Sequence, residues 1–161
     1  MALAVGAPLP AFSLQAAVSA VRIDNAWFTG RRAVIVVHGP KSADAAKQVS
    51  KALRTREPDA SKVAFASIVD LRAFAGIWKK VAQAQLKASY TKLAEKATAA
   101  GLKPEEQVII CPDWDGAVAA AFGVADPDKE PHAIVIGQDG RVLQRRCGAE
   151  LAIAVDDVLA S

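Results

Sequence analysis

The sequence has little sulfur and no hydrophobic run long enough to cross a membrane. Its two cysteines, Cys111 and Cys147, lie far apart and belong to no CxxC or CxxH pair. This spacing argues against a zinc site and a vicinal redox pair. Apolar stretches such as Ala33 to Val37 are far shorter than the ~20 residues of a spanning helix. Because Met1 to Pro10 also lacks the basic and long apolar regions of a signal peptide, we expect a cytoplasmic protein without a membrane segment.

A strong excess of charge of one sign is also absent. Twenty Lys and Arg residues against 17 Asp and Glu residues give a net charge of +3, which is too small to indicate a nucleic-acid-binding protein. Five lysines do gather in one expected helix, at positions 79, 80, 87, 92 and 96. Without an aromatic platform beside them they favour a solvated face, or docking of an acidic protein, over binding of nucleic acid.

Strand and helix patterns alternate along the chain. Residues 11–14 and 20–23 alternate apolar and polar as the strands of a hairpin do. The run Ala33 to Val37 is typical of a central strand buried on both faces. Ser42 then favours the start of a helix that ends before Pro58. The length of 161 residues suits one domain with its own hydrophobic core.

The second half of the chain continues this alternation. The Asp139-Gly140 turn is the strongest hairpin signal in the sequence. Asp113 or Asp115 is placed to cap a short helix, which explains this segment better than a calcium loop. The expected elements are a parallel strand at 63–69, a long helix at 77–99, a strand at 108–110, a short helix ending at 122, a hairpin at 133–136 and 141–146, and a helix at 150–159.

Four segments in this order resemble the redoxin superfamily of thioredoxin-fold proteins, namely the AhpC/TSA-like peroxiredoxins and the TlpA-like and ResA-like thiol oxidoreductases. The first is the "G-x-x-x-P-x-F-x-L" start at Gly6 to Leu14, and the second is the approach to the active site at Gly30 to Val37. Residues 108–124 are similar to "VLxDxDGxVAxAYGV", and residues 130–142 to "xPxxFLIDxDGxI". Together these segments cover nearly the whole chain.

The resemblance implies an α/β thioredoxin-like (redoxin) fold. It implies a central mixed β-sheet flanked by helices, an N-terminal β-hairpin within about the first 30 residues, and an inserted strand and helix before the cis-proline strand. Residues 1–161 would form one domain. Pro131 takes the position of the family's cis-proline, beside the active-site loop, so we expect a cis bond there.

The active-site loop departs from the family. In these families it holds redox cysteines at the start of a helix, because the chemistry needs a stabilised thiolate. Here the loop from His38 to Asp44 contains no sulfur, and Lys41 and Asp44 stand at the two cysteine positions. An ammonium and a carboxylate can neither exchange disulfides nor reduce peroxide. The sequence therefore predicts a pseudoenzyme without thiol turnover.

Cys111 and Cys147 are expected at opposite edges of the sheet, farther apart than the roughly 7 Å limit for a disulfide. We expect both to be reduced. Each is compatible with a small apolar residue near a strand end. The alternative is a thiol-disulfide oxidoreductase or peroxide-reducing antioxidant that uses a displaced cysteine, Cys147 or Cys111. If the Cys147 side chain reaches the surface, the adjacent Arg145 and Arg146 would lower the pKa of its thiol.

The only two histidines, His38 and His132, follow the central strand and Pro131, which the redoxin fold brings together. They could form a polar pocket for an anionic ligand or a partner carboxylate. They could also be polar residues at loop ends that bind no ligand. A weaker alternative is that both histidines bind a metal ion and the protein is a metal carrier. The predicted binding groove consists of His38, Gly39, Pro40, Lys41, Ser42, Asp44, Glu130, Pro131 and His132.

These patterns favour a non-catalytic binding or accessory module. Redoxin grooves bind extended polypeptide beside the cis-proline, so a protein or peptide is the expected partner. Exposed edge strands offer a route to a homodimer. No cofactor is expected.

Overall fold

The protein is built around a five-stranded mixed sheet. The computed structural model describes residues 3–74 and 76–161. The strand order is β5-β4-β3-β6-β7. Strand β4 pairs in parallel with both β3 and β5, whereas the pairs β3–β6 and β6–β7 are antiparallel. The strands are β3 (Arg32–His38), β4 (Val63–Asp70), β5 (Ile110–Asp113), β6 (His132–Ile136) and β7 (Val142–Cys147). The expected mixed sheet with a central β-branched strand is confirmed.

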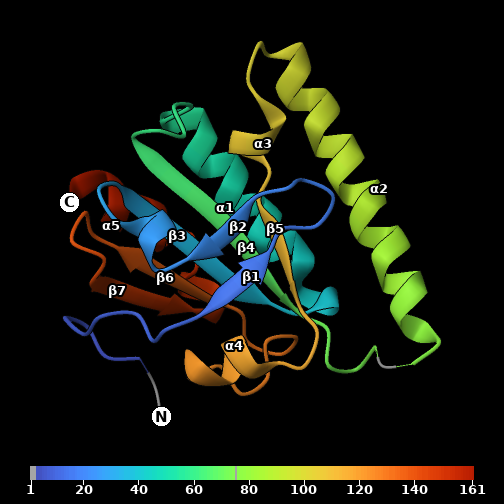
Figure 1. Ribbon diagram of the computed structural model, residues 1–161. Helices are drawn as coiled ribbons and strands as arrows, with labels where there is room; N and C mark the ends of the chain where they lie inside the picture. The colour runs from blue at the N-terminus through green and yellow to red at the C-terminus, as the bar shows by residue number, and fades with distance from the viewer. Residues whose placement is uncertain (1–2, 75) are drawn as a thin grey trace.

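One face of the sheet is covered by the N-terminal hairpin and a short helix (Figure 1). The hairpin consists of β1 (Ser13–Gln15) and β2 (Arg22–Asp24), which pair in antiparallel fashion as expected. Three aromatic rings join these layers: Phe12 packs against Phe28 with ring centroids 5.9 Å apart and edge-on against Phe122 at 5.3 Å. Phe28 ends the 3-10 helix η1 (Ala26–Phe28), and Phe122 follows α4 (Ala117–Ala121).

The opposite face is covered by α1 (Ala43–Arg56) and α5 (Ile153–Ala160). Residue Ser42 directly precedes α1, as the sequence predicts. The last helix begins later than expected, because Gly148–Glu150 forms the separate 3-10 helix η3. Val49 and Leu53 of α1 and Val155 and Val158 of α5 are buried against the sheet. This periodic burial stabilises both helices more than their local sequence does.

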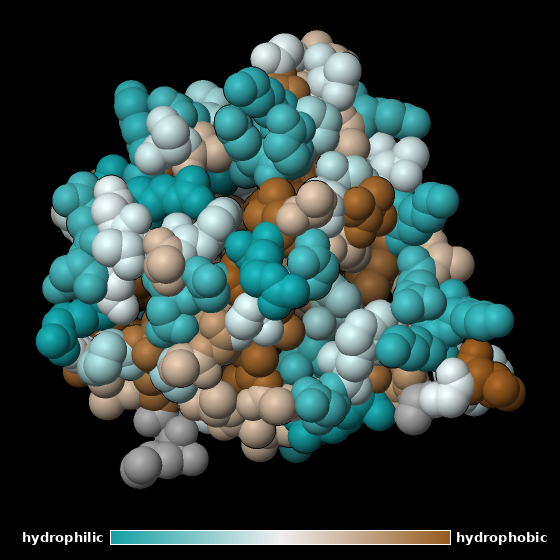
Figure 2. Space-filling model, viewed as in Figure 1, coloured by the Kyte–Doolittle hydropathy of each residue, from teal (hydrophilic) through white to brown (hydrophobic). Residues whose placement is uncertain are grey.

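The long helix α2 (Trp78–Ala99) contributes little to the core. Only Ala82 and Ala97 of this helix are buried. The helical spacing of Trp78, Ala82 and Leu86 predicts one apolar stripe facing the core, but Trp78 is 59% exposed. In Figure 1 the helix runs along the side of the molecule and leads into α3 (Pro104–Gln107). Figure 2 shows mainly hydrophilic residues along it, with brown apolar atoms at its lower end. None of the described helices is long and apolar enough to cross a membrane.

Candidate functional site

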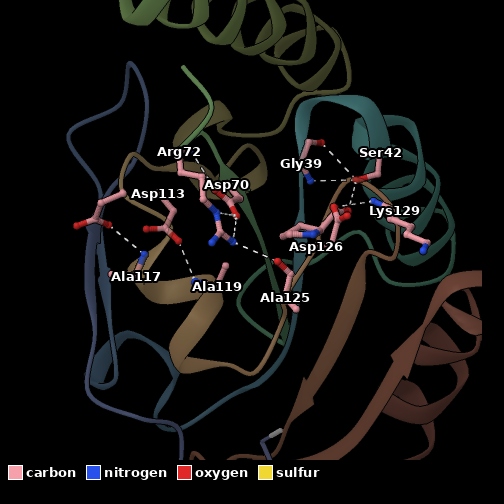
Figure 3. A network of polar contacts seen from close by, with 12 residues as sticks. Gly39, Ser42, Asp70, Arg72, Asp113, Ala117, Ala119, Ala125, Asp126 and Lys129 are labelled. Carbon is pink, nitrogen blue, oxygen red and sulfur yellow. Dashed lines mark hydrogen bonds and ion pairs between the residues drawn. The ribbon is translucent and has the colours of Figure 1, made fainter. Parts of the chain in front are cut away.

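The loop between β3 and α1 is held by a segment from far along the chain. The backbone N–H of Gly39 donates to Ser42 Oγ at 3.0 Å, and this hydroxyl donates to the carbonyl of Pro127 at 2.7 Å. The backbone N–H of Lys41 donates to Asp128 Oδ1 at 2.7 Å. Figure 3 shows Gly39 and Ser42 beside this segment, labelled at Asp126 and Lys129. Residues 126–129 therefore cover the loop that begins α1.

Asp128 takes the anionic position at the short 3-10 helix η2 (Pro40–Ser42), which leads directly into α1. A carboxylate is favourable there because the first N–H groups of a helix are unsatisfied and carry partial positive charge. Gly39 makes the approach possible, since a Cβ on this residue would lie 2.1 Å from Asp128 Oδ1. Asp44, which the sequence analysis places in the pocket, points into solvent and is 92% exposed. The sequence reasoning missed Asp128, although an acidic residue next to Pro127 in the segment before Pro131 was visible in the sequence.

The cis bond expected at Pro131 is a wrong prediction. No peptide bond among residues 3–74 and 76–161 is cis. A trans bond before proline is favoured by about 0.5–1 kcal/mol when nothing local opposes it. The carbonyl of Pro131 accepts a hydrogen bond from the N–H of Gly148 at 3.2 Å, so this backbone already has a partner inside the chain.

The two histidines project from opposite faces of the sheet. His132 is paired with Val37 across β3 and β6, so both side chains lie on one face. His38 is the next residue after Val37, and its side chain therefore points to the other face. The structure thus brings the two backbone segments together but not the two imidazoles.

His38 is a buried and neutral residue. Its Nε2 lies 2.7 Å from Ser67 Oγ, and its Nδ1 lies 2.9 Å from the carbonyl of Gly39. A carbonyl can only accept, so Nδ1 carries the proton and the Ser67 hydroxyl donates to Nε2. Burial lowers the pKa of His38. Both ring nitrogens are satisfied, which favours a structural role for this histidine.

His132 belongs to a cluster with Glu130, Arg145 and Cys147. The ligand atoms of Glu130, His132 and Cys147 lie within 4.8 Å of one another. However, Arg145 Nε donates to His132 Nδ1 at 3.0 Å, which leaves the proton of the neutral ring on Nε2, facing Glu130 Oε1 at 3.4 Å. A metal ion would need the Nε2 lone pair and would lie near a guanidinium. This donor set therefore fits a metal poorly.

Neither cysteine is an activated thiol. Both are free, with Cys111 on β5 and Cys147 on β7, the two opposite edges of the sheet as expected. Burial raises the pKa of Cys111 to about 12. The lowered pKa expected at Cys147 as a displaced thiol is a wrong prediction: burial and Glu130 raise it and outweigh Arg145. Arg146 is bound to Asp157, with Nε 2.8 Å from Oδ2.

The overall architecture matches that of thiol-disulfide oxidoreductases. A DsbE thiol:disulfide interchange protein from Chlorobium tepidum superposes with a TM-score of 0.64 at 16% identity, over 99% of this chain and 98% of that one. The exposed lipoprotein thioredoxin Etrx1 from Streptococcus pneumoniae gives 0.64 at 13% identity, over 94% and 98%. StoA from Bacillus subtilis gives 0.63 at 11% identity, over 96% and 98%. This chain has the thioredoxin fold.

The comparison of sequences adds no closer relationship. No protein-family model matches this thioredoxin-fold chain, and no curated protein matches it significantly. One similar structure is named as an exposed lipoprotein and another as a secreted disulfide oxidoreductase. These names give no support to the cytoplasmic location that the sequence analysis expects.

Two buried carboxylates support the segment that covers the α1 loop (Figure 3). Asp113 Oδ2 accepts the N–H of Ala119 at 2.9 Å, and burial raises the pKa of this carboxyl. Asp115 accepts the N–H of Ala117 at 3.0 Å. Both aspartates therefore bind N–H groups in the first turn of α4, although the residue at the N-cap is Gly116 and not the expected aspartate. On the neighbouring strand, Asp70 binds Arg72, whose guanidinium reaches the carbonyl of Ala125 at 3.4 Å. These contacts anchor the chain directly before residue 126.

Proposed function

We propose that this thioredoxin-fold chain is a non-catalytic binding protein. The observation that supports this function is the start of α1, where Lys41, Ser42 and Asp44 replace sulfur and Asp128 takes the anionic position. Disulfide exchange and peroxide reduction both need a thiolate that is stabilised and accessible. The backbone N–H of Lys41 is hydrogen-bonded to the carboxylate of Asp128. This loop therefore contains no nucleophile, and its N–H group is not free to stabilise one.

The alternative, a thiol enzyme using a displaced cysteine, is less favoured. The raised pKa of Cys111 and of Cys147 keeps both thiols protonated near neutral pH. The two are also too far apart, on opposite edges of the sheet, to form the paired disulfide of an oxidoreductase. Cys147 could act only with a thiol from another molecule.

The geometry favours binding outside the groove that the sequence analysis expects for a peptide. Residues 126–129 cover the part of that groove at Gly39 to Ser42, and Glu130 and His132 are bound to each other on the other sheet face. We therefore propose that the fold is retained as a scaffold, with binding at another surface that shares only His38 and Pro40 with the predicted groove.

Activity assays on the pure chain test this proposal. Insulin reduction and peroxide consumption are measured for the native protein and for Cys111→Ser and Cys147→Ser. A variant with both Lys41→Cys and Asp44→Cys serves as a control that restores two cysteines at the start of α1. We expect the native protein to show no turnover above buffer. Turnover that disappears in either serine variant would refute the non-catalytic function and identify the thiol.

A further inference from the structure

A half-open apolar pocket lies between the sheet and α2. It has a volume of about 820 Å³, within the roughly 300–1,000 Å³ typical of small-molecule sites. Its apolar walls come from β4, α2 and β5, and include Phe65, Val69, Leu86, Leu93 and Ile110. An apolar pocket of this size is large enough to hold a small molecule.

The charge around the cavity has one sign. Four cationic side chains line it, namely Lys47, Lys51, Arg54 and Lys96. Among the described residues, no aspartate or glutamate lines it. Lys47 lies 3.9 Å from the exposed Asp44, a contact that is weak in water. The cavity thus combines an apolar interior with a positive lining, which is complementary to an amphipathic anion.

Two of the four cations lie at one end of the pocket. Arg54 and Lys96 lie in the last turns of α1 and α2, and both helices run toward the upper part of Figure 1. Arg54 donates through one terminal nitrogen to the carbonyl of Val63 at 2.8 Å, but its Nε and other terminal nitrogen are buried without a partner among the described residues. Glu57 is the nearest acidic side chain to influence Arg54, and it does not line the cavity.

The other end holds one satisfied polar pair and one cation, Lys47, whose charge acts on His38. His38 and Ser67 line the cavity where β3 and β4 end, and each is hydrogen-bonded to the other. They add no charge to the interior, because the imidazole is neutral. A ligand with a long apolar body would place it along Phe65 and Val69 and its anionic head beside Lys51, Arg54 and Lys96.

The geometry points to a binding site for a long-chain carboxylate in this cavity. The inference rests on the proposed function, because it names the ligand class of the proposed binding protein. Sequence reasoning missed this site, since Lys51, Arg54 and Lys96 belong to two separate helices and have no common motif. Only the fold places them around one space.

Titration of the full chain with cis-parinaric acid, a fluorescent 18-carbon carboxylate, tests the inference. We expect a saturable increase in fluorescence with one site per chain. Ser89→Phe fills the cavity from α2 and should weaken binding at least tenfold. Its matched control, Ala84→Phe, adds the same ring at an exposed position of α2 outside the cavity and should leave the affinity unchanged.

A second pair of variants tests the anionic head without enlarging any side chain. Lys51→Gln together with Lys96→Gln should weaken binding by roughly fivefold or more, since even one exposed charge contact is worth up to about 1 kcal/mol. The exposed Lys87→Gln with Lys92→Gln, which do not line the cavity, should match the native protein. Hexadecanoate should displace the probe far better than hexadecanol does.

Three outcomes would overturn the inference: no saturable binding, equal weakening by both members of a pair, or equal competition by the acid and the alcohol. A dimer that excludes the probe, detected by size-exclusion chromatography at the same concentration, would assign the apolar cavity to a second copy instead. The thiol assays are run on the same preparation. Turnover there would refute the proposed non-catalytic function, whereas failed probe binding without turnover would refute only the ligand class.

Discussion

Replacing Asp128 by alanine tests whether the carboxylate of Asp128 holds the loop before α1 closed. The change removes the hydrogen bond from the Lys41 N–H to Asp128 Oδ1. One such bond contributes about 0.5–1.5 kcal/mol, and a negative charge at a helix start about 0.3–1 kcal/mol. Because the contact is exposed and water can replace part of it, we expect a loss of about 1–2 kcal/mol in the free energy of unfolding.

Urea unfolding measures this loss, and thermal unfolding should show a decrease of roughly 2–8 °C in Tm for a chain of this length. Asp128→Asn keeps an oxygen acceptor and should recover more than half of the loss. The control is Asp44→Ala, which removes a carboxylate that is also near the start of α1 but is 92% exposed and makes no backbone contact; it should cost under about 0.5 kcal/mol.

Hydrogen exchange gives a local readout of the same contact. The Lys41 amide should exchange faster in Asp128→Ala than in Asp44→Ala, because only the first substitution removes its acceptor. An Asp128→Ala variant as stable as the native protein, with unchanged exchange at Lys41, would refute the reasoning that residues 126–129 hold this loop closed.

Further predictions concern the same loop and the buried titratable groups. Gly39→Ala places a Cβ 2.1 Å from the carboxylate of Asp128, so it should lower the free energy of unfolding of the native chain. The loss should be smaller when Asp128→Ala is also present, which a double-mutant cycle measured by urea unfolding will test. Burial lowers the pKa of both His38 and His132 in the folded protein. Below about pH 6.5 the unfolded state therefore binds more protons than the folded state, and the free energy of unfolding should fall as the pH drops. In His38→Gln this fall should be smaller, and an unchanged pH dependence would contradict the assignment. The pKa of Cys111 is raised to about 12, so Ellman's reagent should label it only on unfolding, after Cys147, and rapid labelling of Cys111 in the native chain would show that β5 opens.

The fold could be predicted because its signals are local and repeated. The β-branched run of β3, the Asp-Gly turn before β7 and the serine before α1 each indicate their element without knowledge of distant residues. The order of these elements then restricts the topology. The placement of α2 was less predictable, because helical spacing shows which residues share a face but not what covers that face. Trp78 is exposed, although its spacing predicts burial.

The site was harder to predict because its contacts join distant residues. Gly39 and Asp128 meet only after β6 has paired with β3, and no local pattern reports that approach. The two histidines illustrate the same limit at finer scale. The sequence predicts that His38 and His132 lie at neighbouring points of the sheet. His132 pairs with Val37 and not with His38, so the two histidine side chains point to opposite faces.

The residues at the start of α1 depend on one another. Asp128 can reach the Lys41 N–H only because residue 39 has no side chain, and Ser42 fixes the same segment through Pro127. Without Asp128, the Lys41 N–H would be left to water. Here the acceptor is internal, and Arg72 binds the carbonyl of Ala125 just before it. Contacts from within the chain therefore close this loop, whereas the pocket between the sheet and α2 is open.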